Sequence, residues 1–114
     1  MTAFAHLCTV TASTKKLPPV SGGKRGDPIP SLSGLKCLPL DPVDSRTARR
    51  LELPSIIELK QTFTQGTLAT TYIESGHLFI DAGTGIEYAV RHVEEWMWSE
   101  TIQTLRIIIE EVKQ

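Results

Sequence analysis

One stretch decides the fold class: His77-Leu-Phe-Ile-Asp81, then Ala82-Gly-Thr-Gly85, then Ile86-Glu-Tyr-Ala-Val-Arg91. Two runs rich in apolar, β-branched and aromatic residues flank four small residues, which is the clearest hairpin signal in the chain. A turn with positive φ explains both glycines, because the stretch lacks the spacing of a phosphate-binding loop. Residues 93–98 extend the second arm. The stretch predicts an antiparallel hairpin within a mostly β fold.

Further strands are predicted on both sides of this hairpin. Thr101 to Val112 fits both helical and strand spacing, and its many β-branched residues favour a strand. Ser55 to Thr64 is predicted as a strand that ends at the turn of Gly66. Leu68 to Tyr72 is predicted as an extended link or a short strand. The first strand is predicted over Phe4 to Ala12.

Residues 13–34 are the most unusual segment. Proline removes the amide donors that a sheet needs, and glycine favours turns. The segment therefore predicts a long basic loop, and loops of this length are usually functional or disordered. The prolines and glycines on which this prediction rests are Pro18, Pro19, Gly22, Gly23, Gly26, Pro28 and Pro30.

A short edge strand and a short helix are predicted next. Leu35 to Leu40 reads as a strand limited by its proline. Asp41 can cap a helix with Pro42 at its first position, and Asp44 is an alternative cap for a shorter turn. Pro54 ends the segment. One short basic helix or helical turn is expected here.

The whole chain is predicted to be one domain, 1–114. It has 114 residues, 40% of them hydrophobic and 22% charged, which is ordinary for a globular protein. No stretch approaches the roughly 20 apolar residues that cross a bilayer, and no secretory signal is recognisable. We expect a small β-barrel or sandwich of about five or six strands, a long loop in the first half and one short helical turn.

The two halves of the chain carry opposite charge. Residues 1–54 contain eight Lys and Arg against four Asp and Glu, a net of +4. Residues 55–114 contain four against nine, a net of −5. Such a division is typical of a surface that meets partners, including head-to-tail contacts between copies, although chance explains it equally well.

The scattered cysteines and histidines suggest no metal site. Cys8 and Cys37 lack CxxC spacing and are predicted to be buried and reduced, with a disulfide left open. His6, His77 and His92 have no zinc-ligand spacing among themselves or with the cysteines. Neither metal nor cofactor is expected.

No catalytic residue is proposed from the sequence. The adjacent pairs Glu94-Glu95 and Glu110-Glu111 would point to opposite faces of their strands, so neither forms a general acid/base couple. A Cys–His dyad would need a third, orienting group that the sequence does not indicate. The chain is therefore predicted not to be an enzyme.

Basic and aromatic residues are the remaining candidates for binding. Trp96 and Trp98 share a strand face and are predicted to fill the core, with an interface role as the alternative. Basic side chains can bind phosphates or another protein, and no aromatic residues interleave with them as a stacking platform requires. The candidate partner-contact residues are Lys15, Lys16, Lys24, Arg25, Arg46, Arg49 and Arg50.

Three segments of the last third together suggest a family. They are Gly76-His-Leu-Phe-Ile-Asp, then Gly85-Ile-Glu-Tyr-Ala-Val-Arg-His-Val-Glu-Glu-Trp-Met-Trp, then Leu105-Arg-Ile-Ile-Ile-Glu-Glu-Val-Lys. This order of hairpin, tryptophan strand and C-terminal strand resembles the head-closure, or stopper, connector proteins of tailed bacteriophages. Cys37-Leu-Pro-Leu resembles their early strand. The likeness covers residues 35–113, and His77 departs from it where an Asp often follows the glycine.

The resemblance implies a small β-barrel that assembles as a ring, often dodecameric, at the phage neck. Such a ring joins the portal or adaptor protein to the tail-terminator or tail tube protein and helps retain the packaged DNA that passes through its channel. The protein would then be a virion component assembled in the host cytoplasm. We expect residues 13–34 to extend to neighbouring subunits, and residues 66–75 are the second candidate for such a contact.

Two other functions remain open from the sequence. A tail-terminator or tail-completion protein is also a small ring former, and the symmetry of the assembled particle distinguishes it. A small β-barrel nucleic-acid-binding module is the alternative from another class. Salt-sensitive DNA binding that is lost on neutralising Lys15, Lys16, Lys24 and Arg25 would favour that module.

Overall fold

The computed structural model describes residues 3–17, 20–21, 24–25, 27–53 and 59–112. Seven antiparallel strands form one sheet in the order β4-β1-β7-β8-β9-β6-β5, and β2 pairs with β3 in a separate hairpin. In chain order the elements are α1 (Ala3–Leu7), β1 (Val10–Lys16), β2 (Val20–Ser21), β3 (Lys24–Arg25), β4 (Ile29–Cys37), β5 (Asp41–Pro42), α2 (Ser45–Arg50), β6 (Leu59–Gln65), β7 (Leu78–Asp81), β8 (Glu87–Met97) and β9 (Gln103–Glu111).

The sheet curls until β4 meets β6. Cys37 of β4 pairs with Thr64 of β6. The hydroxyl of Thr64 donates to the Lys36 carbonyl at 2.8 Å, and that of Thr62 donates to the Leu38 carbonyl at 2.7 Å. The closure is partial, because β4 and β6 share this one residue pair. The prediction of a small, mostly β fold, either barrel or sandwich, is confirmed as a partly closed barrel of seven strands where five or six were expected.

The core lies inside the barrel, and the inner face of β9 supplies much of it. Leu105, Ile107 and Ile109 are fully buried there, in one cluster with Phe79 and Val90. The intervening Ile108 is also fully buried, because α2 covers the opposite face of β9. A strand covered on both faces reads as a continuous apolar run. This explains why the periodicity of residues 101–112 is ambiguous, and the predicted strand is confirmed.

The predicted central hairpin is present as β7 and β8. Leu78 pairs with Ala89 in an antiparallel register. At the turn, the Gly85 amide donates to the Asp81 carbonyl at 2.7 Å, and Gly85 has a φ of 76°. Gly83 does not adopt a positive φ, so the prediction that both glycines need one holds only for Gly85.

The first strand begins later than predicted. Phe4 lies in α1, and β1 starts at Val10 and continues to Lys16. Phe4 is 1% exposed and packs edge-to-face on Trp98, with ring centroids 5.3 Å apart. The prediction of a strand over residues 4–12 is therefore wrong for its first half, because a contact distant in sequence holds this segment as a helix.

The predicted long loop is largely a pair of strands. β1 extends to Lys16 and β4 begins at Ile29, so most of the described residues in 13–34 are in strands, including those of β2 and β3. Irregularities in the pairing of β1 with β4 accommodate the segment. One lies at Gly34, which has a φ of 68°, and at another the Leu32 amide donates to the hydroxyl of Thr14. Residues 18–19, 22–23 and 26 lie outside the described residues.

The short helix uses the later of its two possible caps. Asp44 accepts the Thr47 amide at 2.6 Å, and α2 begins at Ser45. Asp41 and Pro42 form β5 instead, so the prediction that they cap and start the helix is wrong. The predicted stop at Pro54 lies outside the described residues.

The predictions for residues 55–64 and for residues 68–72 have different outcomes. The strand predicted over Ser55 to Thr64 is observed as β6, Leu59–Gln65, while residues 55–58 lie outside the described residues. Leu68 to Tyr72 is not a strand. The amide of Thr71 donates to the Thr67 carbonyl at 2.9 Å, so this link is a turn.

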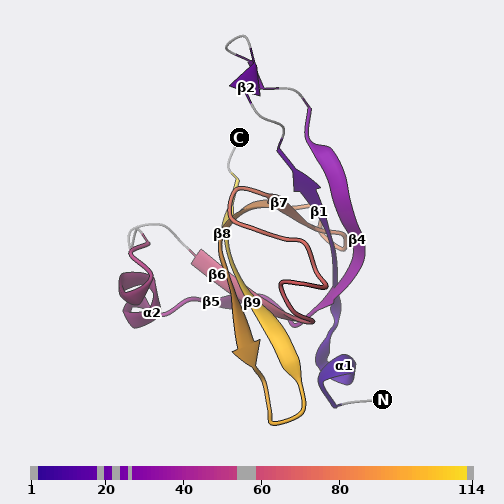
Figure 1. Cartoon of the computed structure of the whole chain (residues 1–114), viewed down its shortest axis with the longest axis vertical. Helices are drawn as coiled ribbons and strands as arrows, with labels where there is room; N and C mark the ends of the chain where they lie inside the picture. The colour runs from indigo at the N-terminus through magenta and orange to yellow at the C-terminus, as the bar shows by residue number, and fades with distance from the viewer. Residues whose placement is uncertain (1–2, 18–19, 22–23, 26, 54–58, 113–114) are drawn as a thin grey trace.

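The two projecting hairpins lie at opposite ends of the molecule. The longest dimension is 48 Å, and Figure 1 shows the β2–β3 hairpin at the upper end of this axis and the β8–β9 tip at the lower end. α2 lies to one side of the barrel (Figure 1). The surfaces described next occupy α2, the tip and the sheet face between them.

Candidate protein-interaction surface

The outward face of β6, β9 and β8 carries a layer of polar and aromatic side chains. Paired residues on neighbouring strands share a face. Arg106 pairs with Phe63 on one side and with Glu94 on the other, and Trp96 pairs with Thr104. We call this the outer face, because the opposite face of β9 fills the barrel.

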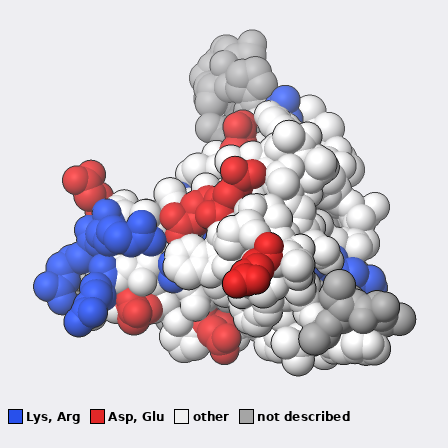
Figure 2. Space-filling view, turned by 60° about the horizontal axis from the view of Figure 1, so that its bottom comes forward, with Lys and Arg blue, Asp and Glu red and all other residues white. Residues whose placement is uncertain are grey.

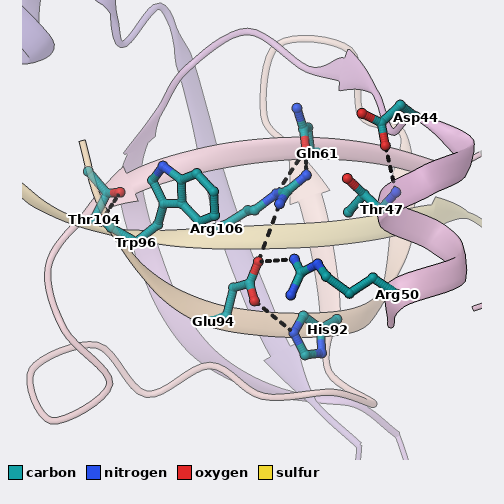
Figure 3. Close-up of polar contacts among 9 residues, drawn as sticks. All are labelled: Asp44, Thr47, Arg50, Gln61, His92, Glu94, Trp96, Thr104 and Arg106. Atoms are coloured by element: carbon teal, nitrogen blue, oxygen red, sulfur yellow. Dashed lines mark hydrogen bonds and ion pairs between the residues drawn. The ribbon is translucent and has the colours of Figure 1, made fainter. Parts of the chain in front are cut away.

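Arg106 lies at the centre of the outer face. Its guanidinium donates to the Gln61 side-chain oxygen, 2.9 Å from Nε, and its Nη1 lies 3.3 Å from Oε1 of Glu94. The ring of Trp96 covers it, with the guanidinium carbon 5.3 Å from the ring centroid (Figure 3). Arg106 is only 7% exposed. These contacts give a buried cation the partners that it needs.

Glu94 connects this arginine to α2 and to a histidine. One oxygen of Glu94 lies 3.4 Å from a guanidinium nitrogen of Arg50 as well as 3.3 Å from Arg106. The other oxygen lies 3.4 Å from Nε2 of His92 (Figure 3). The carboxylate therefore links α2 to the sheet. The spacing of His92 and Glu94 in the sequence places both on the same side of a strand. The sequence alone does not indicate that Arg50 and Arg106 are the partners of Glu94.

α2 is short, capped at both ends and anchored by one buried residue. Ala48 packs against Leu59 and Ile108 of the sheet. Two bonds from Thr47 to the Asp44 side chain hold the pKa of that carboxyl below its usual value. The helix C-terminus closes with the Leu53 amide on the Ala48 carbonyl at 2.8 Å, which is the bond of a Schellman motif.

The arginines of α2 face solvent. Arg46, Arg49 and Arg50 are all exposed, because Ala48 turns the opposite side of the helix toward the sheet. Figure 2 shows them as one basic cluster at the side of the molecule, next to a face that carries acidic side chains. We call these three residues the arginine patch.

An aromatic group occupies the other end of the outer face. Phe63 lies between Trp96 and Trp98, with centroid distances of 6.4 and 5.5 Å, and Phe4 covers the edge of Trp98. Trp96 is 43% exposed and Trp98 is 41% exposed, and Met97 between them is 52% exposed on the opposite face. The prediction that the tryptophans fill the core is wrong, because their strand extends past the barrel.

The structure divides the seven predicted contact residues into separate groups. Lys15 and Lys16 end β1, where the ammonium of Lys16 lies 5.7 Å from the ring centroid of Tyr72. Lys24 and Arg25 form β3 in the projecting hairpin. The arginine patch lies apart from that hairpin (Figure 1), so the seven residues do not form one surface, and Arg46, Arg49 and Arg50 are the largest group among them.

Both cysteines are reduced. Cys37 is fully buried, and burial, followed by the neighbouring Cys8 thiol, raises the pKa of Cys37 to about 12. Cys8 is half-buried beside an open pocket that Phe4 and Leu35 also line, and burial raises its pKa. Both groups are therefore protonated thiols near neutral pH.

His77 is a buried residue that sequence reasoning could not place. It is 3% exposed, and neither ring nitrogen has a hydrogen-bond partner among the described residues. Its Nε2 lies 3.7 Å from a carboxylate oxygen of Glu74, beyond hydrogen-bond distance, and the ring of Tyr72 packs against it. His77 follows Gly76 at the start of the hairpin, and its buried side chain acts as part of the core.

Within the described ranges, no three His, Cys, Asp or Glu side chains are placed to hold a metal ion. No helix among those residues has the length and apolar character to cross a membrane. The outer face, with the arginine patch at one end and exposed tryptophans at the other, is the candidate functional surface. Neither a known family model nor a curated protein matches the chain.

Proposed function

We propose that this protein is a structural assembly protein, and not an enzyme, that forms a ring at the neck of a tailed bacteriophage. The ring joins the portal or adaptor protein to the tail-terminator or tail tube protein and helps retain the packaged DNA. A dodecamer is the stoichiometry that the family resemblance implies. The site of action is the virion, after assembly in the host cytoplasm.

One observation carries the proposal of an assembly role. Three consecutive large apolar side chains, Trp96, Met97 and Trp98, are each more than 40% exposed on a hairpin that projects from the barrel. Soluble proteins rarely expose large apolar patches unless a partner covers them, and tryptophan is enriched at the energetic centres of interfaces. A projecting tip with apolar side chains on both faces suits insertion against another subunit.

The phage assignment rests on the resemblance of residues 35–113, supported by the fold. The family resemblance implies a small β-barrel, and the sheet forms one. Projecting hairpins at both ends of a 48 Å axis suit a subunit that contacts a protein above it and another below.

The first test is a peptide-mass census of purified phage particles from the source culture. We expect this chain at a low, ring-like copy number relative to the capsid protein. Absence from intact, DNA-filled, tailed particles would exclude the connector function. Tail termination in place of head closure would appear as a ring that follows the six-fold order of the tail.

The second test uses the exposed tip. Trp96→Ser with Trp98→Ser is expected to give DNA-filled heads that leak and tails that remain unattached, because the tip no longer binds its partner. Val112→Ser is the matched control, since Val112 is 39% exposed and follows β9 at the end of the strand remote from the tip. Normal tailed particles from the tryptophan variant would contradict an essential role for the tip.

The arginine patch favours one alternative, a nucleic-acid-binding module. Three exposed guanidinium groups on one short helix can contact phosphates. If the protein has that function, the isolated protein binds DNA. Its affinity should then fall steeply as the salt concentration rises, and neutralising Arg46, Arg49 and Arg50 should abolish the binding. Binding of that kind, together with absence from virions, would replace the connector proposal.

A further inference from the structure

The tip of the β8–β9 hairpin is both aromatic and acidic. Residues 94–105 contain three glutamates and no lysine or arginine. Glu100 is exposed, as are Trp96 and Trp98, whereas Glu95 lies on the opposite face of β8 and its carboxylate accepts the Leu68 amide at 3.2 Å. We call Trp96, Trp98 and Glu100 the tip patch. It joins negative charge to the flat rings on which guanidinium groups stack.

The arginine patch has the complementary chemistry. α2 places three arginines within six residues, all exposed. Arg50 is partly engaged by Glu94 of its own chain, whereas Arg46 and Arg49 have no ion-pair partner in the described part of the chain. Two cations are thus available to another molecule.

The two patches do not meet within one copy. α2 lies beside the barrel and the tip projects from its lower end (Figure 1). Between them lie Arg106 and Glu94, which already engage each other and occupy the middle of the outer face (Figure 3). Complementary patches that cannot meet in one chain can meet between two chains.

We propose that the tip patch of one copy docks onto the arginine patch of the next copy. Arg46 and Arg49 stack on the exposed indoles and pair with Glu100 of the tip, as Arg106 already does within the chain by covering Trp96 and pairing with Glu94. This proposal rests on the proposed ring and supplies its subunit contact. The contact joins two different surfaces, so it is heterologous and closes into a ring where the rotation between copies permits.

Charge reversal on either side tests the contact in purified full-length protein. One variant carries Arg46→Glu and Arg49→Glu, and the other carries Glu100→Arg. Each alone places like charges at every contact and is expected to lower self-affinity by about tenfold or more in sedimentation equilibrium. Glu95 is left unchanged because it binds the Leu68 amide within its own chain. Arg50 is left unchanged because it binds Glu94 within its own chain.

Mixing the two variants is the decisive measurement. Each contact in an alternating assembly then joins opposite charges, either arginine on glutamate or glutamate on arginine, so we expect self-association to return to near the wild-type level. The chain that carries all three substitutions should also associate by itself. Rescue cannot come from a misfolded variant, so recovery separates a lost contact from a lost fold.

Three results would overturn the proposal. They are a wild-type protein that stays monomeric at about 1 mM, reversal variants that associate as the wild type does, and a mixture that fails to recover. High salt should weaken the wild-type contact, since exposed charge pairs are screened. Because these measurements use purified protein, they stand apart from the virion census: absence from particles would remove the phage function without affecting the self-contact.

Discussion

Arg106 lies directly beneath the indole of Trp96, with its guanidinium carbon 5.3 Å from the ring centroid, and its polar atoms bind Gln61 and Glu94. The buried guanidinium of Arg106 therefore packs against the exposed ring of Trp96. Through Glu94, which also pairs with Arg50, it is connected to α2. The two ends of the candidate interaction surface share this one support. Loss of Arg106 is expected to affect both.

Arg106→Met should lower the free energy of unfolding by about 1–3 kcal/mol, because it leaves Gln61 without its charged donor and removes one of the two arginine partners of Glu94. Urea unfolding followed by tryptophan fluorescence measures this change. Arg91→Met is the matched control: Arg91 pairs with Glu110 but is 48% exposed, so a loss of about 0–1 kcal/mol is expected. Equal losses from both variants would show that the buried contacts of Arg106 contribute no more to the free energy of unfolding than the exposed pair of Arg91 and Glu110.

Glu52→Gly should stabilise the protein. Glu52 follows α2 with a φ of 57°, a conformation that is unfavourable for residues with a Cβ atom and that glycine adopts freely. We expect a gain of about 0.5–1 kcal/mol in the same urea measurement, partly offset by the greater freedom of glycine in the unfolded chain.

Glu52→Ala separates backbone conformation from charge. Alanine removes the carboxylate but keeps the Cβ atom, so its stability should stay near that of the wild type. If alanine stabilises as much as glycine does, the carboxylate and not the φ angle is the source of the effect.

The sequence is sufficient to predict a mostly β fold but not the outer face of the sheet. The hairpin of residues 77–91 has a turn flanked by β-forming runs, and β9 is rich in β-branched residues, so local chemistry alone indicates both. The burial of Arg106 depends on which residues of β6 and β8 lie opposite it, and that register is set by the whole sheet.

The errors in the sequence predictions share one physical cause, which is contact between distant segments. Phe4 is helical because Trp98 packs on it, more than 90 residues away in the chain. Residues 29–37 form a strand despite Pro30 and Gly34, because irregular pairing with β1 accommodates them. Trp96 has the spacing of a core residue, and only the projection of its strand beyond the barrel exposes it.

The cap of α2 should make its stability depend on pH in the acid range. Hydrogen bonds from Thr47 hold the pKa of Asp44 below its usual value of 3.8. The stabilisation is therefore present above the unfolded pKa and is lost as pH falls through the folded one. The chemical shift of the Thr47 amide in NMR should therefore change as the pH falls below about 4. Asp44→Asn keeps an oxygen acceptor without titrating, so its Thr47 signal should lack this transition.

The two thiols should differ in reactivity although neither is ionised near neutral pH. Cys37 is fully buried with a pKa raised to about 12, while Cys8 is half-buried beside an open pocket. A thiol-alkylating reagent at about pH 8 should therefore label Cys8 slowly and leave Cys37 unlabelled until the protein unfolds, as peptide mass spectrometry would show. Cys8→Ser should take up no label when folded and one label in denaturant.

The same burial predicts how alkaline pH affects stability. The pKa of Cys37 is raised on folding, so its neutral form is favoured in the native state, and the stabilisation is complete below the unfolded value of 9.0. It should be lost progressively as pH rises from there toward about 12, since the unfolded chain ionises first. Urea midpoints of the wild type should therefore fall over this range more steeply than those of Cys37→Ala. Parallel curves, or labelling of Cys37 at the rate of Cys8, would mean that solvent reaches the closure of the barrel between β4 and β6.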